Sequence, residues 1–516
     1  MLQNLKNIAV VSLSTVGSRL LGLLRDILIF AALGTSLWNS AFILAFTLPN
    51  LFRRLLGEGA LTSALVPVFS DVLNKQGLSG AFYFFNQVLL RLLLTLALIV
   101  TVGSGFLVWA SGRAWLPERW VLGAELAVWL LPYMLFICLA AIISAGLNLV
   151  GRFAVAASTP ILLNAAMIGA LLLGQWYAAD SRALVYWLCG GVLLGGALQL
   201  VVPAIDLMRQ GWRPKIERRG GAELTELWQL FLPGLMGAAI LQVNILVSRV
   251  LAHSLDESAV SVLYLASRLM ELPLGVFTIA VATVFFPLLA RARSEGDHAG
   301  FAAAFLRGMR LIIGIALPAG VGLAVLGEPI LDLLFLWGAF ERADVIATLP
   351  LLMIYGLGLP FYSAATFATR GLHAVKDMRT PVRVAGLCLL INLLAGLWLM
   401  QIFGAAGLAA ANVLAAIVQS VCLWRALAGQ HATLGFSGLR RPLLKVMLAS
   451  LAMGIVCLIG AALLAELGLG QKSTAVLVVF VCVPGGAVFY LGLLYWLRFE
   501  EFDGLKQLLL RYKPGI

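Results

Sequence analysis

Residues 48–70, LPNLFRRLLGEGALTSALVPVFS, and residues 272–290, LPLGVFTIAVATVFFPLLA, share one pattern. Each stretch begins with Leu-Pro and continues through a segment with small residues to a second proline, Pro67 or Pro287. Each ends three positions after that proline, at Ser70 or Ala290. The second prolines lie 220 positions apart, and the Thr-Pro pairs that end GLNLVGRFAVAASTP (146–160) and GLHAVKDMRTP (371–381) lie 221 apart. Two independent matches with nearly the same offset predict an internal repeat.

The composition predicts a protein that lives in a membrane. Of 516 residues, 62% are hydrophobic and only 12% are charged. Apolar runs of about 18 or more residues, long enough to cross about 30 Å of hydrocarbon, recur along the whole chain. We therefore expect an all-α polytopic membrane protein with about 14 transmembrane helices. The expected spans are 8–33, 38–57, 80–110, 121–149, 156–178, 183–207, 225–253, 258–288, 300–326, 344–369, 381–402, 405–427, 442–465 and 474–497.

The basic residues predict the orientation of these spans. With the N-terminus placed inside, the inside connections hold 24 Lys and Arg residues and the outside connections hold five. This bias follows the positive-inside rule and predicts that both termini are cytoplasmic. The net charge of +12 is therefore explained by topology, and a nucleic-acid partner is not expected. The six cysteines lie inside apolar spans without C-x-x-C spacing, so buried thiols are expected and a metal site is not.

The repeat predicts how the chain is divided. We expect an N-lobe of six helices at 1–207, a cytoplasmic linker at 208–224 and a C-lobe of six helices at 225–428. Residues 429–516 would add the last two spans and a cytoplasmic tail. Because each lobe begins with a helix that enters from the cytoplasm, the repeats are parallel and related by an axis along the membrane normal. Two such halves are typical of transporters, in which they rock about a central site.

The segment GSRLLGLLRDILIF, residues 17–30, places Arg19, Arg25 and Asp26 inside the first expected span. An arginine near the bilayer centre costs about 2.5–3.5 kcal/mol on insertion scales. Arg19 and Asp26 share a helix face, and Arg25 lies about 100–120° around the helix from them. A charged sector this wide predicts a water-filled cavity. The alternative is internal pairing, with Arg25 or Arg19 bound to Asp26.

Other arginines extend this set. Arg53 and Arg54 lie near the inner end of the second span, after Pro49, and Arg268 lies three residues before Glu271. Guanidinium groups favour phosphates and carboxylates through bidentate hydrogen bonds, so an anionic ligand is expected. Pairing of Arg268 with Glu271 is the alternative. The remaining arginines in the spans lie nearer to span ends, where a long side chain can reach the interface; they are Arg91, which is ambiguous, Arg249, Arg307 and Arg310.

Four segments together carry a family resemblance: SRLLGLLRD, AFILAFTLPNLFRRLLGEGALTSALVPVFS, YLASRLMELPLGVF and KDMRTPV. They resemble the MurJ/MviN family of lipid II flippases, within the multidrug/oligosaccharidyl-lipid/polysaccharide exporter superfamily, and the resemblance covers the whole chain. It implies export of an undecaprenyl-diphosphate-linked peptidoglycan precursor from the inner to the outer leaflet by alternating access. It also implies that the last two spans form a groove for the polyprenyl tail.

The resemblance assigns roles to individual residues. Substrate-binding arginines that grip the diphosphate would be Arg19, Arg25, Arg53 and Arg268. The supporting residues of the cavity would be Asp26, Ser40, Asn50, Arg54, Glu58 and Glu271. Two positions depart from the family pattern, because Ser40 stands where an aspartate is expected and Thr47 where a base is frequent. This departure puts in doubt any gating or proton-carrying role for position 40.

The expected setting is the bacterial cytoplasmic (inner) membrane. The expected partners are lipid II, membrane lipids and the cell-wall synthesis machinery, with the chain as a monomer. No cofactor or catalytic residue is expected, and the energy source is left between membrane potential and a monovalent cation. Alternatives are an exporter of another polyprenyl-linked oligosaccharide and a drug exporter of the same superfamily, although a basic cavity argues against cationic drugs. An embedded glycosyltransferase or phosphatase is disfavoured because the four histidines show no ligand spacing.

Overall fold

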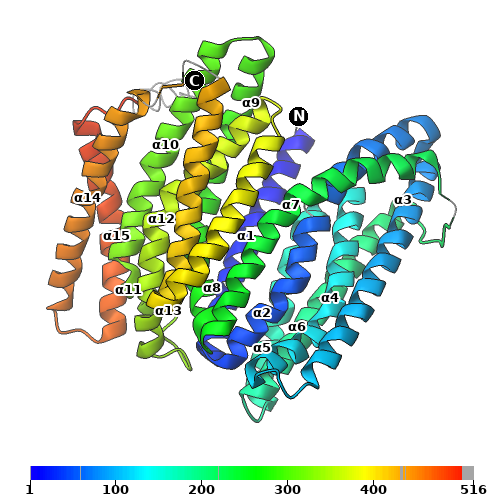
Figure 1. Ribbon diagram of the computed structural model, residues 1–516, viewed down its shortest axis with the longest axis horizontal. Coiled ribbons are helices and arrows are strands. Elements are labelled where there is room, and N and C mark those ends of the chain that lie inside the picture. The colour runs from blue at the N-terminus through cyan, green and yellow to red at the C-terminus, as the bar shows by residue number, and fades with distance from the viewer. Residues whose placement is uncertain (1, 58–59, 219, 431–433, 436, 502–516) are drawn as a thin grey trace. The chain divides into compact units, whose positions relative to one another are not determined.

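The computed structural model describes the chain except for residues 1, 58–59, 219, 431–433, 436 and 502–516 (Figure 1). The described residues form helices and no strand. The elements are α1 (Leu2–Leu33), α2 (Leu37–Phe52), η1 (Arg53–Gly57), α3 (Ala60–Ser111), α4 (Glu118–Leu149), α5 (Phe153–Tyr177), α6 (Ser181–Arg209), α7 (Ala222–Leu255), α8 (Ala259–Pro273), η2 (Leu274–Thr278), α9 (Ile279–Ser294), α10 (His298–Val325), α11 (Gly327–Leu334), α12 (Arg342–Ala374), α13 (Arg379–Gln430), α14 (Ser437–Ala465) and α15 (Gln471–Trp496).

These helices confirm an all-α polytopic membrane protein. Eleven helical stretches of the described chain are long and apolar enough to cross a membrane. Two of them, Leu37–Ser111 and Arg379–Gln430, each contain two of the expected spans, and α1 is the remaining expected span. Within α3 and α13 the break between helices is a glycine with positive φ, Gly77 at 69° and Gly404 at 57°. Glycine adopts this backbone conformation without a Cβ clash, so the chain can leave one helix and begin the next.

Two π-helices, η1 and η2, occupy matching positions of the repeat. They begin at Arg53 and Leu274, which lie 221 positions apart, the same offset as the Thr-Pro pairs. Each follows a proline at the end of an α-helix, Pro49 in α2 and Pro273 in α8. Proline lacks the N–H that an α-helix needs, and a widened π turn is one way in which the following backbone adjusts. The structure thus repeats a local irregularity that the sequence pattern alone does not specify.

By internal contacts the chain forms two compact units. Unit 1 comprises Met1–Ser261 with Gly338–Phe340, and unit 2 comprises Val262–Trp337 with Glu341–Ile516. In unit 1, α4 packs against α2, α3 and α6, and α5 packs against α1 and α6. Unit 1 also includes α7, which packs against α3. The expected lobes, at 1–207 and 225–428, are repeat halves rather than units of compactness, and they stay a prediction.

The expected cytoplasmic linker is held against α3 in unit 1. The indole Nε1 of Trp212 donates to Asn86 Oδ1 at 2.8 Å, and Asn86 Nδ2 donates to the carbonyl oxygen of Arg213 at 2.9 Å. Arg91, the ambiguous arginine of the third expected span, donates to the carbonyl oxygen of Arg218 at 3.2 Å. Both Trp212 and Asn86 are buried. The connection between α6 and α7 is therefore part of the fold of unit 1.

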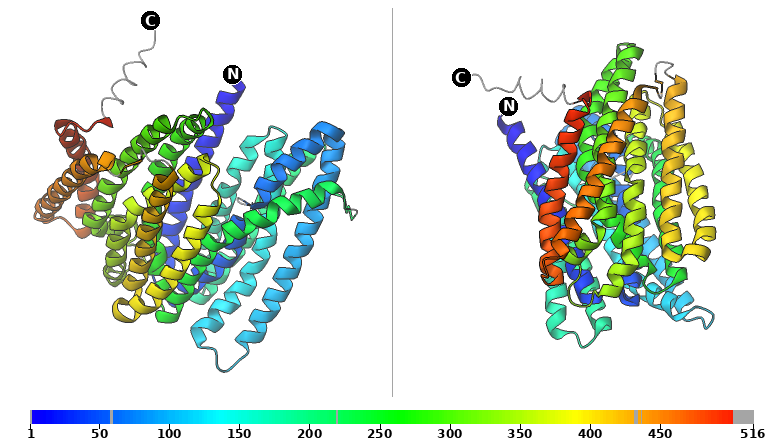
Figure 2. Two further views of the ribbon diagram at one scale, coloured as in Figure 1. Left: turned by 45° about the horizontal axis from the view of Figure 1, so that its top comes forward. Right: turned by 90° about the vertical axis from the view of Figure 1, so that its left-hand side faces the viewer.

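In unit 2, the terminal helices α14 and α15 pack side by side, and α14 also packs on α10 (Figure 2). Their buried contact includes Met453, Cys457 and Cys482. Tyr490 of α15 donates from its hydroxyl to the carbonyl oxygen of Gly314 in α10 at 2.6 Å. Other side chains of this pair are apolar and exposed, among them Phe480 at 70%. An exposed apolar surface is what a helix in contact with lipid requires.

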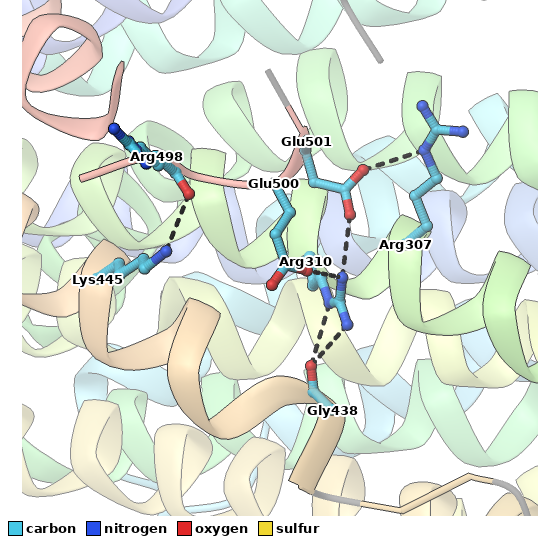
Figure 3. A network of polar contacts seen from close by, with 7 residues as sticks. All are labelled: Arg307, Arg310, Gly438, Lys445, Arg498, Glu500 and Glu501. Carbon is cyan, nitrogen blue, oxygen red and sulfur yellow. Dashed lines mark hydrogen bonds and ion pairs between the residues drawn. The ribbon is translucent and has the colours of Figure 1, made fainter. Parts of the chain in front are cut away.

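A charged network joins the end of α15 to α10 and to the start of α14 (Figure 3). Arg310 donates to the carbonyl oxygen of Gly438 at 2.8 Å and to Glu500 at 2.6 Å. Glu501 accepts from Arg307 Nε at 3.0 Å and from Arg310 at 3.5 Å. The two arginines that the sequence places near a span end thus meet acidic partners from a segment about 190 residues away.

Candidate functional site

Arg25 of α1 is held in one orientation by two helices of unit 1. Its Nη2 lies 2.6 Å from Asp26 Oδ1, and its Nη1 donates to Asn164 Oδ1 of α5 at 3.0 Å. Asn164 in turn donates to the carbonyl oxygen of Ser18 at 3.2 Å. The Asp26 side chain is 2% exposed and that of Arg25 is 11% exposed. The internal pairing that the sequence left open is therefore present for Arg25, through a contact between adjacent residues.

Arg19 differs from Arg25 although both lie on α1. Its side chain is exposed and has no hydrogen bond or ion pair with any residue in the described part of the chain. The segment of residues 17–30 thus contains one arginine fixed by a carboxylate and an amide, and one arginine whose guanidinium is accessible. Such a pair can contribute an oriented donor and an adaptable donor to the same anion.

The inner end of α2 contains the next predicted group. Arg53, the first residue of η1, donates from Nε to Asn50 Oδ1 at 3.3 Å, and Asn50 Nδ2 donates to the carbonyl oxygen of Phe46 at 3.2 Å. Asn50 therefore orients Arg53 from three residues before it. Arg54 is exposed. Glu58, also predicted for this site, lies outside the described residues.

Ser40, the first departure from the family pattern, is completely buried in unit 1. Its hydroxyl donates to Ser261 Oγ at 3.1 Å, and Ser261 lies 221 positions further along the chain, which is the repeat offset. Ser261 also donates to the carbonyl oxygen of Thr35 at 3.2 Å. Since both side chains are hydroxyls, this contact between α2 and the start of α8 contains no carboxylate. No proton-carrying role follows for position 40.

Thr47, the second departure, receives a guanidinium from another helix. Arg249 of α7 donates from Nη1 to Thr47 Oγ1, and Thr47 donates to the carbonyl oxygen of Ile43 at 2.6 Å. Thr47 is buried and Arg249 is partly exposed. A cation therefore stands beside position 47 although residue 47 itself is neutral.

Arg268 and Glu271 of α8 belong to unit 2. Their closest side-chain atoms, Nη1 and Oε2, lie 3.4 Å apart, and the side chains are 30% and 46% exposed. The predicted alternative for this pair is thus present as a loose contact between residues three apart. An exposed pair of this kind is weak, about 0–1 kcal/mol, so the guanidinium can exchange its partner for a stronger anion.

The predicted substrate arginines thus divide between the two units, with Arg19, Arg25 and Arg53 in unit 1 and Arg268 in unit 2. Within unit 1, α1 and α2 contact each other, and both belong to the same packed group as α4, α5 and α7. The single cavity expected for all four side chains stays a prediction.

The described residues contain no group of three or more His, Cys, Asp or Glu side chains that could hold a metal ion. Asp377 precedes α13 and caps its start, with Oδ1 accepting from the backbone N–H groups of Arg379 and Thr380. It accepts hydrogen bonds from Thr380 Oγ1 at 2.7 Å and from Gln430 Nε2 at 3.0 Å. Burial opposes ionisation of this carboxyl, but these hydrogen bonds prevail and lower its pKa below the usual value. The carboxylate oxygens of Asp377 therefore accept hydrogen bonds that stabilise the connection between α12 and α13.

Three polar contacts of this region were not expected from the sequence: Asn164 with Arg25, Ser261 with Ser40, and Arg249 with Thr47. An amide within the apolar span 156–178 is a signal that could have indicated Asn164. Ser261 could have been found by adding the repeat offset to Ser40. The sequence places Arg249 near a span end, where its side chain could reach the interface, and does not indicate the hydrogen bond to Thr47 that the packing of α7 on α2 allows.

Comparisons with known proteins agree on one family. The sequence model of the family described as "Lipid II flippase MurJ" matches residues 29–478. The chain is 31% identical over 512 residues to "Probable lipid II flippase MurJ" of Bdellovibrio bacteriovorus, covering 98% of this chain and 96% of that protein. It is 37% identical over 430 residues to the protein of the same description in Rhizobium meliloti, covering 82% of this chain and 80% of that protein.

The fold gives the same result. The solved structure described as "Lipid II flippase MurJ, inward closed conformation" superposes with a TM-score of 0.77 at 26% sequence identity. The superposition covers 94% of this chain and 97% of the solved one. The similarity therefore extends over most of both units.

Proposed function

The chain belongs to the lipid II flippase MurJ family, and from this premise we propose that it carries lipid II across the bacterial inner membrane with its arginines gripping the diphosphate. It is a multi-pass membrane transporter and not an enzyme. The cargo joins a disaccharide-peptide to a polyprenyl chain through a diphosphate. An exporter must therefore accept a hydrophilic head group and a hydrophobic tail at once.

The observation that carries the proposal is the set of hydrogen-bond partners and the exposure of the three arginines in unit 1. Arg25 is oriented by the carboxylate of Asp26 and the amide of Asn164, Arg53 is oriented by the amide of Asn50, and Arg19 is exposed. Oriented guanidinium groups inside apolar helices suit a multivalent anion, because each adds bidentate, charge-assisted hydrogen bonds. In the same proposal, Arg268 of unit 2 exchanges Glu271 for the diphosphate, and Asp26 and Arg54 support the site.

Transport would follow by alternating access of two repeat-related halves. The matched offset of η1 and η2 supports two halves that bend at equivalent positions, since π turns are frequent at functional sites in helices. The exposed apolar side chains of α14 and α15 support a role for this pair in holding the polyprenyl tail. The excess of basic residues in every second connection supports cytoplasmic termini.

Coupling to the membrane potential is the energy source that this site favours. A charge that crosses the whole membrane potential changes free energy by about 2.3 kcal/mol per 100 mV, so empty arginines would be driven back toward the negative inside. A monovalent cation remains the second candidate. The second candidate for the cargo is another polyprenyl-linked oligosaccharide, which would use the same diphosphate contacts.

The test is replacement of the resident flippase. A bacterium depleted of its own lipid II flippase would express this chain, and lipid II exposed on the outer face would be measured. We expect the wild type to restore exposure and Arg19→Ala, Arg25→Ala, Arg53→Ala and Arg268→Ala to lose it. Arg182→Ala is the matched control, because Arg182 is exposed at the start of α6 and pairs only loosely with Glu125, at 3.5 Å.

The outcomes separate the parts of the proposal. Exposure that survives all four substitutions would contradict the arginine grip and leave the cargo assignment in place. A correctly inserted wild type that exposes no lipid II would contradict the cargo assignment.

A further inference from the structure

An exposed apolar face of α6 leads directly into the connection between α6 and α7. α6 is one of the helices that are long and apolar enough to cross a membrane. Exposed apolar side chains recur on it at spacings of three and four residues, which places them on one face. They are Leu194, Leu198, Val201, Ile205 and Met208. The next residue, Arg209, is exposed and is the last of the helix. The connection therefore begins where the lipid-facing surface of α6 ends.

The start of α7 shows the same boundary from the other side of the connection. α7 begins at Ala222, and Trp228 follows six positions later with 38% of its surface exposed. The exposed apolar residues Leu230 and Leu232 come next. Tryptophan is enriched where hydrocarbon meets the lipid head groups, and six residues of helix span about 9 Å. Both ends thus place the connection at the level of the head groups.

The connection has no regular secondary structure over residues 212–218, yet α3 holds it at two points. At the first point, Asn86 accepts from the indole of Trp212 at 2.8 Å and donates to the carbonyl oxygen of Arg213 at 2.9 Å. The Trp212 ring also packs edge-on against Phe85, with ring centroids 6.0 Å apart. At the second point, Arg91 donates to the carbonyl oxygen of Arg218 at 3.2 Å. The backbone is therefore fixed at both ends of this stretch.

The charged side chains of the stretch point away from these anchors into the open. We call residues 209–218 the basic strap, since they include four bases and one acid, Glu217. The four bases are exposed, and none forms an ion pair with a residue in the described part of the chain; they are Arg209, Arg213, Lys215 and Arg218. Between them, Ile216 is 74% exposed. The strap thus presents several cations and one apolar side chain on a fixed backbone.

We propose that the basic strap is a docking surface for the head groups of anionic phospholipids, with Ile216 as its apolar contact. Guanidinium and ammonium groups donate charge-assisted hydrogen bonds to phosphate oxygens. Each Lys or Arg near an anionic membrane surface strengthens attachment about fivefold, the equivalent of about 1 kcal/mol. The bound lipids would hold this end of α6 and α7 at the head-group level. The inference goes beyond the proposed function and does not depend on the cargo.

The competing explanation is that these bases serve only as an orientation signal. Such a signal needs positive charge beside the spans and no fixed conformation. The strap instead has a backbone fixed by the buried residues Trp212 and Asn86 and by Arg91, so its bases are held together at one surface. A lipid is favoured over an acidic protein as the partner, because the strap continues the exposed apolar face of α6.

The experiment measures which lipid collects beside the strap of the purified full chain. A fluorophore is attached to Ile216→Cys protein in phosphatidylcholine nanodiscs that contain a small, equal fraction of spin-labelled phosphatidylglycerol or spin-labelled phosphatidylcholine. Five of the six native cysteines are buried, and protein without the new cysteine gives the labelling background. We expect quenching to report an affinity about fivefold or more higher for phosphatidylglycerol, the contribution of at least one base.

Two charge variants of the labelled protein test the cause of this preference. Arg213→Gln, Lys215→Gln and Arg218→Gln together should bring the affinity ratio close to one. The matched control removes the same charge from the ends of α12 and α13 in unit 2, through Arg370→Gln, Arg379→Gln and Arg383→Gln. These three arginines are exposed, and none forms an ion pair with a described residue. The control should keep the ratio of the labelled protein with its charges intact.

Three results would overturn the inference. One is equal quenching by both lipids when the strap is intact, which would leave the strap to a partner other than lipid. Another is a preference for phosphatidylglycerol that survives the loss of the three strap bases. The third is a preference that the control variant loses equally, which would assign it to net charge.

If the strap variant fails to insert, salt decides without a variant. In about 1 M salt the Debye length falls to about 3 Å, so the preference for phosphatidylglycerol should fall toward one. A preference that salt leaves unchanged would contradict docking through the bases.

Discussion

At the scale of single residues, the contrast between Arg19 and Arg25 shows what decides the role of a charge inside a membrane helix. They lie six residues apart on α1, yet Arg25 is fixed by Asp26 and Asn164 whereas Arg19 is exposed. The sequence predicts that both line a polar site. It could not predict which one pairs with Asp26, because the choice depends on Asn164, 139 positions away.

This contrast predicts that stability and transport separate between two substitutions. Asp26→Asn removes the carboxylate beside Arg25 and leaves a largely buried guanidinium with a weaker partner, at a cost on the order of 3 kcal/mol. Arg19→Gln breaks no contact within the described chain and should leave stability nearly unchanged while lowering transport. Thermal unfolding of the two purified proteins, alongside lipid II exposure in depleted cells, measures both effects. Equal melting temperatures would show that the contact with Asp26 contributes nothing to the fold.

At the scale of elements, the positions of the helices could be predicted from the sequence, whereas the π turns within them could not. Apolar run length placed the break at Gly404 between the eleventh and twelfth expected spans, where the structure has it. The π turns η1 and η2 could not be predicted, because a proline permits several local adjustments and packing selects one. The linker between α6 and α7 is expected to connect two lobes, and no sequence pattern indicates that Trp212 anchors it to α3.

The Trp212 anchor leads to a prediction for unit 1. Trp212→Phe keeps most of the buried ring and removes the indole donor, so the buried Asn86 oxygen loses its hydrogen bond. The expected cost is about 1–3 kcal/mol, seen as a lower melting temperature. Trp176→Phe is the matched control, because Trp176 is 83% exposed on α5 and should change the melting temperature little. If both variants melt alike, the linker is not held by this bond.

The charged network of unit 2 leads to another prediction at this scale. The Glu501 side chain is 7% exposed and bridges Arg307 and Arg310. The Glu500 side chain is 58% exposed, and within the described part of the chain its ion pair is with Arg310. Glu501→Gln should therefore destabilise unit 2 more than Glu500→Gln does, because a buried carboxylate shared by two arginines is screened less by water. Comparison of the two melting temperatures at low and high salt checks this. A larger effect from Glu500→Gln would contradict the assigned geometry.

At the scale of the whole molecule, the repeat offset is the feature that sequence and structure share most closely. An offset of 220–221 residues relates the second prolines of the two proline motifs, the Thr-Pro pairs, the two π-helices and the Ser40–Ser261 contact. The fold class could be predicted because membrane crossing imposes a length and a composition on every span. The grouping of α7 with unit 1 could not be predicted from the repeat. The repeat is a similarity of sequence between the halves, whereas the compact units are defined by which helices pack against each other.

The central claim is that this chain moves lipid II between leaflets. The most direct test reconstitutes the purified protein in liposomes that contain labelled lipid II and follows the fraction that becomes accessible to an impermeant reagent. The account predicts transfer well above that of protein-free liposomes, and its loss in Arg25→Ala protein that is inserted and folded. Transfer no faster than in protein-free liposomes, from wild-type protein that binds lipid II and is correctly inserted, would contradict the account.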